Sequence, residues 1–375
     1  MSKTVVMYGG LLALSLGAAW LRYTSDEAAP KEGVVVVEGK PAELAKVVYD
    51  APELDVTFEL REDAFGRHGW VTVEEVKTKQ VDGAETKETK VTRFKAGSAA
   101  DKMIEGLAPL MALRELKDVD DGKLASFGLD APTTKLTVTV AGKDSPLAVG
   151  GETYGTKDVY VRDNVTQRIF VVDDELFKAL KFAATRLPER QLVAAKVEDI
   201  AGITLAKDAQ SVTWDQQNRD DRAAAYWKRG AAEGKDETFG NWLDKFLKVK
   251  SVNYVQDGEA PADLVNAFSV TVRAETGPAE TVQFLTAGEE WFAKSESTRG
   301  LVKLPRGSAK DAADDVLDVL EGKAPPEEPA AAPAGAGDAK PPTVSVSRDE
   351  GQDKGTSSTP KLPTPGLAPV PPKKK

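Results

Sequence analysis

Apolar residues are most concentrated at the N-terminus of the chain. The run from Val5 to Leu21 contains no charged residue, and Lys3 and Arg22 flank it. As a helix, a run of this length would span roughly 25 Å, close to the hydrocarbon thickness of a bilayer. The pattern therefore predicts a single transmembrane helix at the start of the chain.

We expect this helix to remain as an anchor over residues 1–22, followed by a linker over residues 23–44. Two alternatives are a cleaved signal peptide, with the small residues 17–19 as its cleavage site, and a buried helix. A short N-terminal arm usually stays in the cytoplasm. We therefore expect a single-pass protein of the bacterial inner membrane with its body in the periplasm.

The opposite end of the chain has few residues that could form a core. Residues 323–375 are rich in proline and alanine and end in three lysines. Such a composition buries too little apolar surface to offset the entropy of ordering the chain. We therefore expect a disordered tail over this range.

Between these ends, the same order of patterns occurs twice. Each series has an alternating strand, an aromatic strand and a short apolar strand, and the equivalent positions in the two series are separated by a constant offset. The equivalent pairs are Val138 and Val270, Tyr160 and Phe292, and Ile169 and Leu301. The pattern predicts two similar units, residues 45–185 and residues 186–322.

A helix is expected before the strands of each series. In the first unit it begins at Ser98, continues through Met111 and is kinked at Pro109, because proline removes a backbone donor. In the second unit it begins near Thr238, where apolar residues follow the period of one helical face. Those residues are Phe239, Trp242, Leu243, Phe246 and Leu247.

A short helix is expected at the end of each unit. The first would be capped by Asp173 or Asp174, and the second would begin at the capping-box pattern formed by Ser308 and Asp311. The apolar stripes would comprise Leu176, Phe177 and Leu180 in the first, and Val316, Leu317 and Leu320 in the second.

The strands are clustered rather than alternating strictly with helices. Clustering favours an α+β fold with largely antiparallel sheets over a doubly wound fold. Asp82 and Gly83 lie between two alternating runs and indicate a hairpin turn.

Composition excludes several classes of chemistry. The chain of 375 residues has a net charge of −10, which argues against nucleic acid as a partner. It has one histidine and no cysteine, so it has neither a histidine cluster for zinc nor a thiol nucleophile. We predict no catalytic, cofactor-binding or metal-binding residue.

Three segments have residue types that occur in functional sites. His68 is expected in a surface loop, and the glycine-rich segment 150–155 is expected to form a turn between strands. Asp118, Asp120 and Asp121 lack the spacing of a calcium loop and are expected to form a solvated turn.

A characteristic order of residues occurs near the middle of the chain. It comprises Phe127, Gly128, Leu129 and Pro132, followed by Arg186 and Arg190. With the strands between them, these residues resemble the bacterial family known as domain of unknown function 4340 (DUF4340). The resemblance covers roughly residues 45–322.

The resemblance implies a membrane-anchored or secreted envelope protein. Some members accompany ABC transporters of the gliding-motility type, and no enzymatic activity is established that would assign catalytic residues. We expect a non-enzymatic, membrane-tethered accessory or adaptor protein with a protein partner, such as an ABC transporter subunit. The alternatives are an envelope module that contacts peptidoglycan or another polymer, and a hydrolase that uses carboxylates alone.

Overall fold

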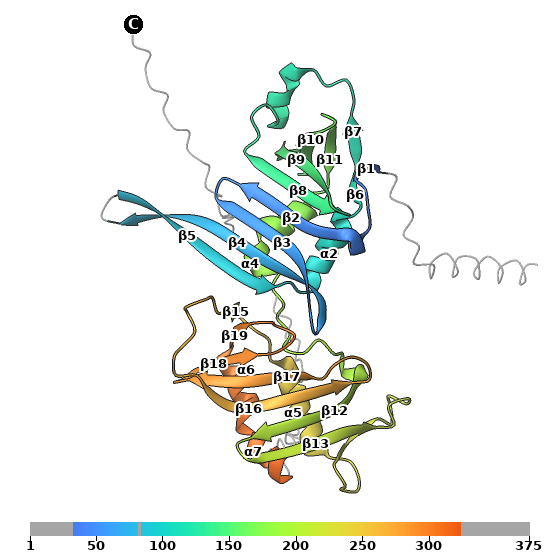
Figure 1. Cartoon of the computed structure of the whole chain (residues 1–375), viewed down its shortest axis with the longest axis vertical. Helices are drawn as coiled ribbons and strands as arrows, with labels where there is room; N and C mark the ends of the chain where they lie inside the picture. The colour runs from blue at the N-terminus through green and yellow to red at the C-terminus, as the bar shows by residue number, and fades with distance from the viewer. Residues whose placement is uncertain (1–32, 82–83, 324–375) are drawn as a thin grey trace, which may run out of the picture. The chain divides into compact units, whose positions relative to one another are not determined.

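The computed structural model describes residues 33–81 and 84–323, which belong to one compact unit (Figure 1). The predicted anchor, most of the predicted tail and the turn at Asp82 and Gly83 lie outside the described residues. Within the described part of the chain, no helix is long and apolar enough to cross a membrane.

The first sheet has nine antiparallel strands. They are β2 (Leu44–Ala51), β3 (Leu54–Asp63), β4 (Gly66–Val81), β5 (Ala84–Lys95), β7 (Arg114–Leu116), β8 (Thr134–Val140), β9 (Lys143–Glu152), β10 (Val159–Asp163) and β11 (Ile169–Val172). Their spatial order is β5-β4-β3-β2-β8-β9-β10-β11-β7. A separate pair is formed by β1 (Val34–Val37) and β6 (Leu110–Ala112).

The second sheet has eight antiparallel strands. They are β12 (Ile200–Lys207), β13 (Gln210–Gln217), β14 (Tyr226–Arg229), β15 (Asn253–Tyr254), β16 (Val265–Ala274), β17 (Glu280–Ala287), β18 (Glu290–Lys294) and β19 (Leu301–Leu304). Their spatial order is β14-β13-β12-β16-β17-β18-β19-β15.

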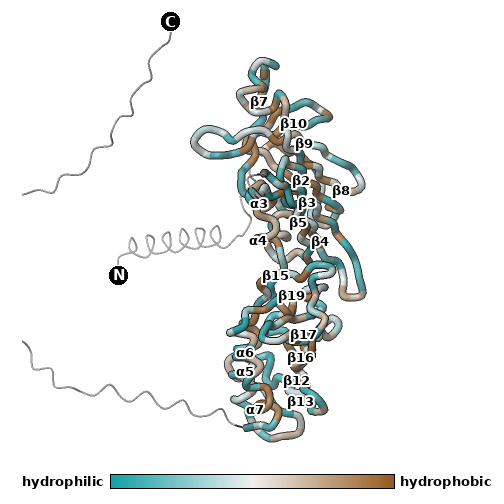
Figure 2. The backbone as a smooth tube through the Cα atoms, turned by 90° about the vertical axis from the view of Figure 1, so that its left-hand side faces the viewer, coloured by the Kyte–Doolittle hydropathy of each residue, from teal (hydrophilic) through white to brown (hydrophobic). Residues whose placement is uncertain are grey.

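Helices cover one face of each sheet (Figures 1 and 2). With the first sheet lie α2 (Ser98–Leu107), α3 (Glu175–Lys181) and α4 (Ala183–Arg186). With the second lie α5 (Glu237–Lys248), α6 (Arg306–Asp314) and α7 (Val316–Glu321). Short 3₁₀ turns are η1 (Pro41–Glu43), η2 (Asp121–Phe127) and η3 (Val197–Asp199). The fold is therefore of the expected α+β type, with antiparallel sheets.

The two sheets have the same strand order once β5 is set aside. Tyr160 lies in β10 and Phe292 in β18, which occupy corresponding places. Arg162 pairs with Ile169 in the first sheet, and Lys294 pairs with Leu301 in the second, at the same offset. The correspondence predicted from the sequence is therefore present in the strand pairing.

The core follows the alternation of apolar residues along the strands. In β3, for example, Val56 and Phe58 are buried while Asp55 is exposed. Helix α5 buries four of the five expected residues, Phe239, Trp242, Leu243 and Phe246, and leaves Leu247 half-buried. The Asp236 side chain accepts a hydrogen bond from the Phe239 N–H and caps this helix.

The expected kinked helix of the first unit is wrong beyond Leu107. Helix α2 ends at Leu107. Leu110 and Met111 belong to β6 and pair with β1. Pro109 has no N–H to donate and disfavours helical geometry at the residue before it, so the chain leaves the helix instead of bending within it.

The expected start of the last helix is also wrong. Helix α6 begins at Arg306, and the Ser308 hydroxyl donates back to the Pro305 carbonyl instead of capping. A second helix, α7, then buries Val316, Val319 and Leu320. The break at Asp315 shifts the helical phase, which leaves Leu317 exposed.

Candidate functional site

The segment that joins the two sheets, residues 187–191, bonds to both of them. Towards the first sheet, the Gly97 N–H donates to Leu187 O and the Glu189 N–H donates to Lys95 O, each at 2.8 Å. Towards the second, the Ser251 N–H donates to Arg190 O at 2.8 Å. This linker segment therefore behaves as an added strand between β5 and the chain leading to β15.

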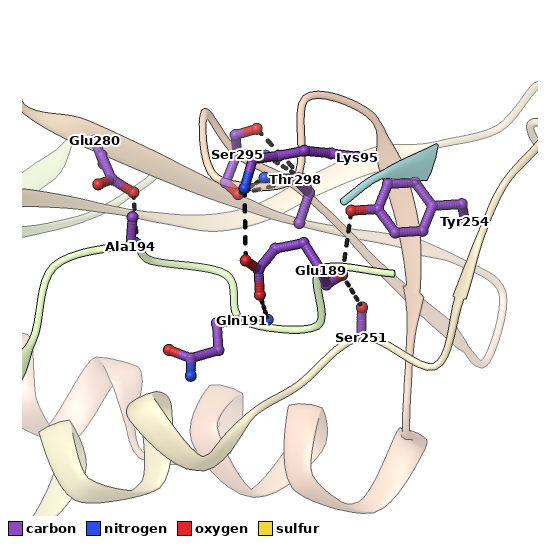
Figure 3. A network of polar contacts seen from close by, with 9 residues as sticks. All are labelled: Lys95, Glu189, Gln191, Ala194, Ser251, Tyr254, Glu280, Ser295 and Thr298. Carbon is purple, nitrogen blue, oxygen red and sulfur yellow. Dashed lines mark hydrogen bonds and ion pairs between the residues drawn. The ribbon is translucent and has the colours of Figure 1, made fainter. Parts of the chain in front are cut away.

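Glu189 is the centre of a polar network at this junction (Figure 3). Its carboxylate lies 3.5 Å from the Lys95 ammonium and accepts a hydrogen bond from the Gln191 N–H at 2.9 Å. Its backbone carbonyl accepts hydrogen bonds from the Tyr254 hydroxyl at 3.1 Å and from the Ser251 hydroxyl at 3.3 Å. Burial raises the pKa of Tyr254, which keeps this phenol a neutral donor.

A second polar contact joins the β3–β4 turn to the β18–β19 turn. The Arg299 guanidinium binds the Asp63 carboxylate at 2.6 and 3.0 Å, a bidentate arrangement. This contact holds the pKa of Asp63 below its usual range. His68 Nδ1 lies 3.7 Å from the same carboxylate.

A cleft of about 580 Å³ lies beside these contacts. One wall comes from the β3–β4 turn and Lys95, and the other from the segment after the linker and from two turns of the second sheet. Side chains of both charges line it, including Arg67, Lys196, Glu280 and Glu296. Pockets that bind partners or ligands often lie where two substructures meet.

The structure corrects the expected position of His68. This residue lies within β4, opposite Arg61 of β3, and only 9% of its side chain is exposed. The two glycines around it suggested a loop, but β3 and β4 stay paired down to Asp63 and Gly66. His68 thus lines the cleft and is not part of a free surface loop.

Two carboxylates in the cleft are held by the main chain. Glu280 accepts a hydrogen bond from the Ala194 N–H at 3.0 Å, and Glu296 accepts one from the Thr281 N–H. Burial, followed by repulsion from Glu296, raises the pKa of Glu280. The buried Ser297 hydroxyl, also in the cleft lining, has no hydrogen-bond partner among the described residues.

We expect Glu280→Gln to change how stability depends on pH. A raised folded-state pKa means that the folded protein keeps this proton to higher pH than the unfolded chain. The stability that this proton contributes is present at low pH. It is lost as pH rises from the ordinary pKa of glutamate through the raised pKa of Glu280. Glutamine can still accept a hydrogen bond from the Ala194 N–H but does not titrate. The melting temperature of the variant should therefore rise relative to that of the wild type as pH increases above the ordinary glutamate pKa of about 4.

Thermal melts across that pH range test this expectation, with Glu62→Gln on the exposed end of β3 as the control. The control should show the wild-type pH profile. An identical profile for Glu280→Gln would contradict the assigned shift.

The signature residues do not form one site. Phe127 ends η2, Gly128 adopts the left-handed φ of 67° that favours glycine, and Leu129 is fully buried beside β9 and β11. The Phe127 ring lies 4.6 Å from that of Tyr160. Pro132 follows, half-buried, before β8. These residues build a small satellite core, which is a structural role.

The two signature arginines lie at the junction instead. Arg190 donates to the backbone carbonyls of Ser251, Val252 and Thr185 at 3.0 to 3.3 Å. Arg186 ends α4 and its guanidinium lies 5.5 Å from the Phe182 ring centre. Sequence reasoning singled out Arg190 through the family resemblance but missed Lys95, Glu189 and Tyr254, with which it shares this junction.

The other two candidate segments also have structural roles. Gly150 and Gly151 lie within β9, and the turn to β10 follows them. Asp120 caps η2 by accepting a hydrogen bond from the Gly122 N–H at 3.2 Å. Within the described residues, no group of histidine, aspartate and glutamate side chains could hold a metal ion.

Comparisons with known proteins give one match. No curated protein and no solved structure matches the chain. Residues 96–266 match the model of the family described as Domain of unknown function (DUF4340). The matched range begins beside Gly97, includes the linker segment and ends in β16, so it contains both signature groups and, of the junction, Glu189 and Tyr254 but not Lys95. Over residues 96–266, the chain is therefore similar to this family.

Proposed function

We propose that the chain is a non-enzymatic, membrane-tethered accessory protein that binds a protein partner outside the cytoplasm, such as a subunit of an ABC transporter. The predicted anchor over residues 1–22 would be the tether. The cleft beside the linker segment is the observation that carries this proposal, because it is large and lined by side chains of both charges.

The lining of the cleft suits a protein surface better than a small apolar ligand. Lys95 and Arg299 are held by Glu189 and Asp63, so their side chains are already positioned before a partner arrives. The Lys196 side chain, in contrast, is exposed and has neither a hydrogen bond nor an ion pair within the described residues. Transient protein interfaces are polar, and complementary charges set their specificity.

A polymer such as peptidoglycan is an alternative occupant of the same cleft. A carboxylate-dependent hydrolase is the second alternative, and the raised pKa of Glu280 beside Glu296 is the observation that favours it. Both carboxylates already accept a hydrogen bond from a backbone N–H group, which supports a role in fixing the main chain around the cleft. Hydrolysis of peptidoglycan fragments that is lost in Glu280→Gln and Glu296→Gln would favour the hydrolase instead.

Charge reversal at Lys196 tests the partner proposal. We expect Lys196→Glu to reduce the yield of a defined membrane-protein cross-link several-fold, because it places a like charge against an acidic patch of the partner. The measurement is cross-linking of the full-length chain in intact membranes, followed by identification of the product. Lys143→Glu, at the exposed β8–β9 turn, is the matched control and should leave the yield unchanged.

Two results would contradict the proposal. One is a cross-link that is equally strong in both variants, which would place the partner elsewhere. The other is recovery of the protein in a soluble fraction after cleavage within the predicted anchor. That result would eliminate the tether.

A further inference from the structure

From Ala84 to Val91, the outer edge of β5 has no neighbouring strand among the described residues. The linker segment pairs only with the end of this edge, at residues 95–97. β5 is the last strand of the first sheet and pairs there only with β4, in a register that continues without a shift from Trp70–Lys95 to Val81–Ala84. β3 pairs with β4 only as far as Glu75. Beyond that point the two strands form a ribbon, and residues 85–90 of β5 are all exposed (Figure 1).

One side chain shows which backbone groups of β5 face outward. The Gln256 amide accepts a hydrogen bond from the Arg93 N–H at 2.7 Å and donates to Arg93 O at 3.3 Å. It therefore occupies the place that a neighbouring strand would take. Because backbone direction alternates along a strand, the N–H and C=O groups of Val91, Thr89, Lys87 and Glu85 face the same way.

An isolated two-stranded ribbon is marginally stable in water, and an open strand edge is a template for pairing. The charges along β5 prevent indiscriminate pairing, so any strand added here must match them. We propose that β5 pairs antiparallel with β5 of a second copy of this chain, centred on Thr89. This proposal is independent of the partner proposed for the cleft.

The charges of β5 select this register. A two-fold pairing centred on Lys87, Glu88 or Lys90 would place that charge directly opposite itself, which is destabilising. Centring on Thr86 leaves only Glu85 and Lys87 to pair along the edge before the strand ends.

Centring on Thr89 instead places Glu85 opposite Arg93 of the second copy. Lys87 then lies opposite Val91, and Glu88 lies opposite Lys90, so no like charges meet. The outward backbone N–H and C=O groups of Lys87, Thr89 and Val91 in one copy then form hydrogen bonds with those of the second copy. The hydrogen bonds between Gln256 and the Arg93 backbone are retained, because the stretch that pairs through backbone hydrogen bonds ends at Val91.

The absence of cysteine from the chain permits a direct test by disulfide cross-linking of the full-length protein in membranes. In the proposed register, residue 89 faces itself across a hydrogen-bonded pair, with Cα atoms about 5.5 Å apart, within disulfide range. Thr89→Cys should therefore form a dimer on oxidation. Lys87→Cys alone should not, because its two copies would lie about 13 Å apart along the strands.

A mixture of Lys87→Cys and Val91→Cys should cross-link again, because these positions oppose each other. A dimer from Thr89→Cys and from the mixture, but not from Lys87→Cys alone, supports the proposal. No dimer from Thr89→Cys, or equal yields from all single variants, would overturn it. Thermal melts establish that each exposed substitution leaves the fold intact.

Charge reversal provides a second, independent measurement. In the Thr89→Cys background, Glu85→Arg and Arg93→Glu should each lower the dimer yield by at least about threefold, because each puts like charges opposite one another. Mixing these two variants should restore the yield, because in a mixed dimer an arginine faces a glutamate at both ends of the pairing. Failure of the mixture to recover would also overturn the register.

Discussion

Replacing Trp242 by alanine is expected to lower the free energy of unfolding by about 3–5 kcal/mol. The indole is 1% exposed and stacks on Phe246 with ring centres 5.6 Å apart. Its Nε1–H donates to Ala312 O at 2.8 Å, which ties α5 to α6. Truncation removes the packing and leaves a buried carbonyl without its donor. Urea denaturation of the full chain measures the loss.

Trp242→Phe separates the two contributions. The smaller ring keeps most of the packing and removes the hydrogen bond, so its cost should be nearer 1–2 kcal/mol. Equal losses for the two variants would assign the whole effect to the hydrogen bond. A loss below about 1 kcal/mol for Trp242→Ala would show that this residue is not a core anchor of the second sheet.

Elements with a strong local period could be predicted from the sequence. Helix α5 has apolar residues on one face and Asp236 at its start, and the structure confirms both its face and its position. The alternating strands at 136–140 and 268–272 likewise form β8 and part of β16. Each of these signals lies within a single helix or strand, so no distant contact is needed to interpret it.

The errors occur where tertiary pairing overrides the local pattern. The residues around His68 are typical of a loop, yet the pairing with β3 extends β4 through them. Leu110 and Met111 continue a helical period, yet they form a strand that pairs with β1. In both cases the partner strand lies elsewhere in the sequence, so the local pattern does not indicate the pairing.

The junction could not be predicted for the same reason. Lys95, Glu189 and Tyr254 come from three distant parts of the sequence, and none has an unusual neighbourhood. Their contact depends on the path of the linker segment between two sheets. The family resemblance singled out Arg190 in that segment, but its role in holding backbone carbonyls needed the structure.

The close approach of the linker segment to the first sheet makes Gly97 the second position where a large effect is expected. A methyl group there would lie 2.9 Å from Glu189 Cα and 3.1 Å from Pro188 O, and backbone atoms cannot move aside as a flexible side chain can. Gly97→Ala should therefore cost about 1–3 kcal/mol of stability by forcing the linker segment away from β5.

Gly106 in α2 is the matched control, because a methyl group there meets nothing within 4 Å. In a helix, Gly→Ala should stabilise by up to about 1 kcal/mol, so the two alanine variants should shift the unfolding midpoint in opposite directions. If Gly97→Ala were neutral or stabilising, the linker segment would not be packed against β5. The Glu189 network could then not fix the geometry of the cleft, and the proposed partner surface would lose its rigid frame.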